Sequence, residues 1–121
     1  MDTPKIRFPG FVKNWEKNNV SELVEIIKSY SYSRNEESEY GTVSHIHYGD
    51  IHSTFKFPVV DLNKIQLPRI NSDIELSGTI ELLCEGDLVF ADASEDLEGV
   101  GKCIELKNIA KLEIIGGLHT I

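Results

Sequence analysis

The stretch EGDLVFADASEDLEGVGKCIELK, residues 85–107, decides the fold class that the sequence predicts. Glu85-Gly86-Asp87 is typical of a turn, and the continuous apolar run Leu88–Ala91 after it predicts a buried strand. Lys102–Lys107 alternates between apolar and polar residues, which predicts a second strand. The acidic, glycine-containing segment Asp92–Gly101 between them is expected to be a loop. The centre of the fold is therefore expected to be β-structure.

Further short β-rich segments lie on both sides of this pair and are separated by turn residues. The expected strands are Thr42–His47, Thr54–Val60, Thr79–Leu83, Leu112–Ile115 and Leu118–Ile121. Together the segments predict an α+β fold, mostly β, with one N-terminal helix followed by about five to seven short strands.

The N-terminal quarter of the chain has a different character. Residues 1–17 contain two prolines and three aromatic rings, and we expect an extended arm whose rings, Phe8, Phe11 and Trp15, pack onto the domain. Residues 18–28 are predicted to form a helix, because Asn19 and Glu22 have the spacing of a capping box and apolar residues recur at helical spacing.

The whole chain, residues 1–121, is expected to be a partial domain with a polar loop at residues 29–40 and a β-rich body at residues 42–121. It stops inside apolar sequence at Ile121, whereas a complete domain usually ends in a polar linker at its surface. The fold is therefore expected to be a truncated one.

Charge and composition limit the classes of protein to be considered. The 121 residues include 12 Lys and Arg against 20 Asp and Glu, a net charge of −8, which weakens any attraction to nucleic acid. The N-terminus lacks the apolar region of a signal peptide, and no apolar run approaches the roughly 20 residues of a membrane span. Cys84 and Cys103 have no metal or redox spacing, and two cysteines without a signal peptide are typical of a reduced, cytoplasmic protein. We therefore expect a cytoplasmic protein without membrane contact.

Catalytic motifs are poorly represented. Gly99-Val100-Gly101-Lys102 lacks the spacing of a phosphate-binding loop, and Ser94 has no G-x-S-x-G setting. We therefore predict no enzymatic activity, no catalytic residue, no cofactor and no resident metal. Two alternatives stay open: a zinc site at His45 and His47 with Asp50 or His52 as a third ligand, and a metal-dependent nuclease site in the acidic loop with Lys102.

Three groups of segments resemble the specificity subunit of type I restriction–modification systems. They occur in the order of that family and span almost the whole chain. The segments are KIRFPGF (residues 5–11) followed by Trp15-Glu16, HYGDI (residues 47–51), and GDLVFADASED (residues 86–96) with Gly101-Lys102 and GLHTI (residues 117–121).

The resemblance implies a division of labour. Such a subunit carries two DNA target-recognition domains separated by long helices, and each domain reads one half of a bipartite target. Modification subunits bind it and methylate adenine, restriction subunits cleave, and the specificity subunit has no catalytic residues. This chain covers the front of one such domain. The implied partners are double-stranded DNA and the modification and restriction subunits, and an exposed sheet edge could also pair with a second copy to give a homodimer.

Base-edge and phosphate contacts require polar, aromatic and basic side chains on loops. The candidates for DNA contact surround the family-like turn, with weaker candidates elsewhere: His45, His47, Tyr48, His52, Ser53 and Lys56, then Arg69, Lys102, His119 and Thr120. The alternative function is that of a protein-interaction or regulatory fragment of such a system that does not bind DNA alone, which the net charge of −8 favours.

Overall fold

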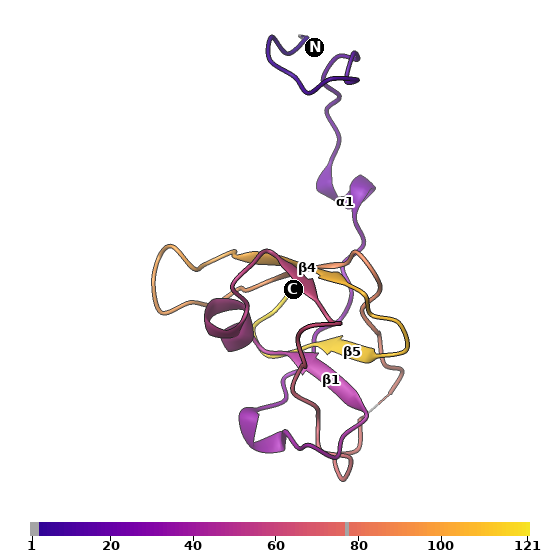
Figure 1. Ribbon diagram of the computed structural model, residues 1–121, viewed down its shortest axis with the longest axis vertical. Helices are drawn as coiled ribbons and strands as arrows, with labels where there is room; N and C mark the ends of the chain where they lie inside the picture. The colour runs from indigo at the N-terminus through magenta and orange to yellow at the C-terminus, as the bar shows by residue number, and fades with distance from the viewer. Residues whose placement is uncertain (1–2, 77) are drawn as a thin grey trace.

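The computed structural model describes residues 3–76 and 78–121 and has mixed α/β content, mostly strand and coil (Figure 1). Within these residues the helical elements are short: α1 (Val20–Leu23), the 3-10 helix η1 (Arg34–Glu36) and the π-helical turn η2 (Asp50–Thr54). The strands are β1 (Val43–Ile46), β2 (Val59–Asp61), β3 (Leu88–Phe90), β4 (Cys103–Lys107) and β5 (Glu113–Gly116).

These strands form two small sheets. β1 and β5 pair in parallel, with Val43 opposite Glu113. β4 is the centre of the other sheet, where it pairs in parallel with β2 and antiparallel with β3. The predicted strands at 42–47, 88–91, 102–107 and 112–115 are confirmed to within one or two residues.

The core lies where the inner faces of the two sheets meet. Ile46 of β1, Leu106 of β4 and Ile114 of β5 have no exposed surface and belong to one apolar cluster. The alternation expected for β4 is confirmed, because Ile104 and Leu106 are buried while their neighbours are more exposed.

β3 is less buried than its apolar run suggested. Val89 is 2% exposed, whereas Leu88 and Phe90 are 51% and 40% exposed. The prediction of a fully buried run is wrong here because β3 turns only one face, that of Val89, to the core.

The predicted helix at residues 18–28 is also wrong in its extent. The capping box between Asn19 and Glu22 is present, but the helix ends after one turn, and Val24 is extended with φ −135° and ψ 152°. The residues that follow include Ile26 and Ile27, whose branched side chains favour strand geometry. The helical turn buries no residue, so no tertiary packing extends it.

The rings of the arm do not pack onto the domain, and its backbone turns at residues 9–10. Phe8, Phe11 and Trp15 are 80%, 69% and 64% exposed, so the packing prediction is wrong. Figure 1 shows the arm beyond α1, clear of the two sheets.

Three other expected strands are shorter than predicted or absent. Thr54 ends η2, and β2 begins only after Pro58, whose ring removes a backbone donor. The segment Thr79–Leu83 is not a strand, although the Leu83 amide donates to the Ile114 carbonyl at 2.7 Å. Near the end of the chain, a single bridge between Ala91 and Thr120 replaces the expected strand.

No helix in residues 3–76 and 78–121 combines the length and apolar character needed to cross a lipid bilayer.

Candidate nucleic-acid interface

One polar cleft gathers residues from segments that are far apart in the sequence. It has a volume of about 520 Å³ and lies between the start of η2 and the acidic loop that joins β3 to β4. Its walls are formed by Arg34, His47, Tyr48, Gly49, His52, Ser53, Ser94, Glu95, Asp96, Glu98, Gly99 and Lys102.

Tyr48 is the centre of an aromatic group at this cleft. Its half-buried ring lies 4.5 Å from the ring of His47 and 6.2 Å from that of His52, measured between centroids. The ring of His119 meets it edge-on at 5.3 Å and an interplanar angle of 88°. Edge-to-face contacts of this kind fix ring orientation. The C-terminal segment is tied to the same place by a hydrogen bond from the Tyr48 amide to the Leu118 carbonyl (3.1 Å).

His52 joins η2 to the acidic loop. Its Nε2 lies 2.7 Å from the Ala93 carbonyl oxygen, and because a carbonyl only accepts, the Nε2 of His52 carries the proton. Gly99 allows the loop to pack closely here, since a Cβ at that position would lie 2.8 Å from His52 Cε1. The loop has its own support: the Gly99 amide donates to Asp96 Oδ1 at 2.7 Å.

A buried carboxylate positions the other wall. Asp50 is 4% exposed; its Oδ1 accepts a hydrogen bond from Arg34 at 2.9 Å and its Oδ2 accepts one from the His47 amide at 2.9 Å. Arg34 also pairs with Glu37 at 2.9 Å, and Glu37 in turn accepts from Nε2 of the fully buried His45 at 2.8 Å. This network connects η1, β1 and η2 and fixes the backbone that carries Tyr48.

The protonation of His47 is constrained by its surroundings. Burial lowers the pKa of His47 below its usual value near 6.5, and the positive charge of Arg34 lowers it further, while Asp50 acts in the opposite direction. The Nδ1 atom accepts a hydrogen bond from the Gly49 amide (3.1 Å), which is lost when Nδ1 is protonated. Both effects favour the neutral form of His47.

This pKa has a measurable consequence for stability. A histidine whose folded pKa is depressed binds more protons when unfolded, so the contribution of His47 to the free energy of unfolding should fall as pH drops below about 6.5 and level off below its folded pKa. NMR titration of the His47 ring should give a pKa below 6.5, and His47→Gln should flatten the pH dependence of the urea midpoint. A His47 pKa at or above 6.5 would contradict the assignment.

The candidate residues from the sequence divide between the cleft and other places. His47, Tyr48, His52, Ser53 and Lys102 line the cleft, and His119 touches Tyr48 beside it. Lys56 is exposed shortly after η2. His45 and Thr120 are buried, and Thr120 Oγ1 donates to the Gly117 carbonyl at 2.8 Å.

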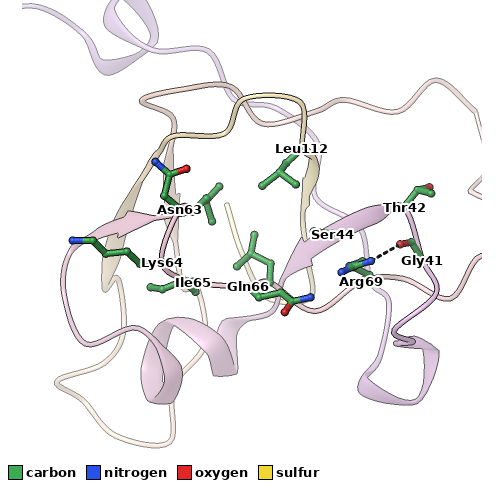
Figure 2. A pocket seen from close by; sticks show the side chains of 11 residues that line it. Gly41, Thr42, Ser44, Asn63, Lys64, Ile65, Gln66, Arg69 and Leu112 are labelled. Carbon is green, nitrogen blue, oxygen red and sulfur yellow. Dashed lines mark hydrogen bonds between the residues drawn. The ribbon is translucent and has the colours of Figure 1, made fainter.

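Arg69 lies in a different hollow, which shares no lining residue with the cleft (Figure 2). There it donates a hydrogen bond to the Gly41 carbonyl at 3.4 Å and another to the Glu39 carbonyl at 3.3 Å. Its guanidinium thus fixes the turn that precedes β1.

Sequence reasoning missed Arg34, because residues 29–40 were expected to be a plain loop. A signal was present: Ser33 and Glu36 have capping-box spacing, and in the structure the Ser33 amide donates to Glu36 Oε2 at 2.6 Å. The closeness of the acidic loop to His52 has no signal in the sequence, because it depends on the pairing of β3 with β4.

The zinc alternative is not supported by the geometry of its proposed ligands. His45 uses Nε2 for Glu37, and Nδ1 of His47 accepts the Gly49 amide. In the described ranges, 3–76 and 78–121, no three His, Cys, Asp or Glu side chains are grouped so that they could hold a metal ion. The metal-dependent nuclease alternative at the acidic loop likewise lacks a group of three such side chains in the described ranges.

No family model, no curated protein and no solved structure matches this chain.

Proposed function

We propose that this chain is the front part of a DNA target-recognition domain, of the kind carried by the specificity subunit of type I restriction–modification systems. The observation that carries the proposal is the meeting of three of the family-like segments around Tyr48, whereas KIRFPGF (5–11) and Trp15-Glu16 lie apart from it in the arm. HYGDI (47–51) supplies its ring, GLHTI (117–121) bonds its amide, and the loop that begins in GDLVFADASED (86–96) bonds the nearby His52.

The chemistry of the cleft supports contact with base edges more than with phosphates. Tyr48, His52 and His119 offer flat ring surfaces. Nε2 of His52 is bound to the Ala93 carbonyl and Nδ1 of His119 lies 3.2 Å from Asp92 Oδ1, which leaves His52 Nδ1 and His119 Nε2 for a base edge. Glu95 and Asp96 repel phosphates, but carboxylates accept hydrogen bonds from the cytosine amino group. Lys102 at the rim of the cleft and Lys56 beyond η2 are the proposed phosphate contacts.

The proposed role is one of recognition without catalysis, in the cytoplasm. The chain would read part of one half-site as part of a specificity subunit. Partner modification subunits would methylate adenine and restriction subunits would cleave. The net charge of −8 predicts that the isolated chain binds DNA weakly and only at low salt.

The proposal predicts a specific salt dependence. With a random duplex at low ionic strength, Lys102→Ala and Lys56→Ala should each reduce the slope of log Kobs against log[salt] by about one unit, because each removes one phosphate contact. Lys64→Ala is the matched control, since Lys64 lines the hollow of Figure 2 and pairs with Asp61 at 3.9 Å. Equal slopes for all three variants and the parent would remove both lysines from the interface.

The second candidate function is a protein-interaction fragment of such a system. Its supporting observation is the net charge of −8, which disfavours DNA. A gel shift with the full chain and a random duplex at low salt distinguishes the two, because the interaction function predicts no shift.

A further inference from the structure

The N-terminal arm, residues 3–17, presents an unusual amount of apolar surface to solvent. Figure 1 shows it projecting from the body beyond α1. Its five large apolar side chains are all exposed: Ile6 (93%), Phe8 (80%), Phe11 (69%), Val12 (82%) and Trp15 (64%). A cluster of exposed apolar side chains of this size is typical of an interaction site.

The arm is organised as a closed loop rather than as a loose tail. Arg7 donates hydrogen bonds to the carbonyls of Pro4 (3.2 Å), Phe11 (2.8 Å) and Lys13 (3.3 Å). The Phe11 amide donates to the Phe8 carbonyl at 3.2 Å. In the described part of the chain, the arm's hydrogen bonds all stay within the arm, so its shape does not depend on the body. So short a segment cannot bury its own rings.

The body carries an apolar groove that could receive such a loop. It has a volume of about 570 Å³ and lies between residues 23–29 and β3, with Leu82 and the C-terminal residue beside it. Exposed apolar side chains line it: Val24 (51%), Ile26 (77%), Leu82 (40%), Leu88 (51%), Phe90 (40%) and Ile121 (54%).

Charge is complementary between the arm and the body. Residues 1–17 contain four basic and two acidic residues, a net charge of +2. Because the whole chain carries −8, residues 18–121 carry −10. Glu25 and Asp87 line the groove together with a single base, Lys28, so the groove is also net acidic and a basic arm would be attracted to it.

We propose that the arm of one copy of this chain occupies the groove of a second copy, and that the exchange is reciprocal. The same surfaces then serve both subunits, which gives a two-fold dimer. The proposal does not depend on DNA recognition.

The connection between arm and body favours a second copy over the arm's own groove. Residues 23–29 form one wall of the groove, and the chain leaves that wall through α1. The capping box there, in which the Asn19 amide donates to Glu22 Oε2 at 2.8 Å, and the extended Val24 direct the arm outward. Docking in its own groove would require the chain to reverse across this turn.

Cys84 provides a direct test, because it is exposed, free and lines the groove. In a Val12→Cys variant of the full chain, mild oxidation should give a disulfide between position 12 and Cys84 of another copy. Non-reducing gels should show a covalent dimer, and peptide mass spectrometry should identify the 12–84 linkage. Adding Cys84→Ser should abolish that linkage, whereas Cys103→Ser should leave it unchanged.

Each result has a defined meaning. A 12–84 linkage within one chain, which runs as a monomer, would show docking in the arm's own groove and would overturn the proposal. Absence of the linkage, with edge-to-edge dimers or with monomers only, would overturn it as well.

A second measurement avoids engineered cysteines. Sedimentation of the parent chain should show a monomer–dimer equilibrium, and Phe11→Asp should raise the dimer Kd by at least about tenfold, as expected for loss of one buried ring. Circular dichroism should be unchanged, because Phe11 contributes nothing to the core. A parent chain that stays monomeric at all concentrations would contradict the exchange.

Discussion

Gly41→Ala is expected to lower the free energy of unfolding by about 3 kcal/mol or more. A Cβ at position 41 would lie 1.8 Å from the Ile70 carbonyl oxygen and 2.8 Å from its carbonyl carbon. That backbone cannot move away freely, because the Ile70 amide donates to the Val43 carbonyl at 2.8 Å and the Arg69 side chain bonds the carbonyl of Gly41. Urea unfolding monitored by circular dichroism measures the loss.

Gly99→Ala is the matched control for this prediction. Its added Cβ would lie 2.4 Å from Ser94 Oγ and 2.8 Å from His52 Cε1, which are side-chain rather than backbone atoms. The Ser94 hydroxyl can rotate away, and the exposed loop can shift from the His52 ring, which the Ala93 carbonyl holds, so the loss should be smaller than that at Gly41. Equal losses for the two variants would show that the backbone beside β1 is not packed as described.

Asp50→Ala is expected to lower the free energy of unfolding by about 3 kcal/mol, because it removes a buried acceptor of two hydrogen bonds. The Arg34 guanidinium and the His47 amide would both lose their partner. The estimate is at the lower end for a buried ion pair, since the Arg34 side chain is 44% exposed and water can replace part of the contact. The wall of the cleft that carries Tyr48 should loosen as well.

Two further variants define the origin of this loss. Asp50→Asn keeps the size of the side chain and one acceptor oxygen but removes the charge facing Arg34, so its effect should be intermediate. Asp73→Ala removes an exposed acidic side chain and should change stability by no more than about 0.5 kcal/mol. A loss at Asp50 as small as that at Asp73 would contradict the role assigned to this carboxylate.

The β-structure was the most predictable part of the fold. β4 is predictable because apolar and polar residues alternate along it, and Ile104 and Leu106 face the core in the predicted way. Segment Leu88–Ala91 was correctly predicted as a strand, but its burial was not. A continuous apolar run does not reveal whether both faces of the strand are covered.

The N-terminal region was predictable in its local signals but not in its packing. The capping box at Asn19 and Glu22 forms, yet the helix it begins stops at Leu23. Helical spacing alone does not stabilise a helix that has no surface to pack on. The exposed rings of Phe8 and Phe11 were also not predictable, because a sequence pattern does not indicate which surface an aromatic side chain packs on.

The cleft was predictable only in pieces. The histidines and the tyrosine between residues 47 and 52 indicate a candidate site for DNA contact, and Lys102 is a candidate because it follows the acidic loop. Their convergence depends on long-range pairing, which places the loop after β3 beside η2. Of the family-like segments, those at residues 47–51, 86–96 and 117–121 contribute to the surroundings of Tyr48, whereas those at residues 5–11 and 15–16 lie in the arm.

The most direct test of DNA target recognition is selection of bound duplexes from a randomised pool by the full chain at low salt, repeated with Tyr48→Ala. The account predicts enrichment of one short motif by the parent chain. It predicts loss of that enrichment in Tyr48→Ala, with the fold retained by circular dichroism. Failure of the parent chain to enrich any motif, or the same motif enriched by Tyr48→Ala, would contradict recognition through this cleft.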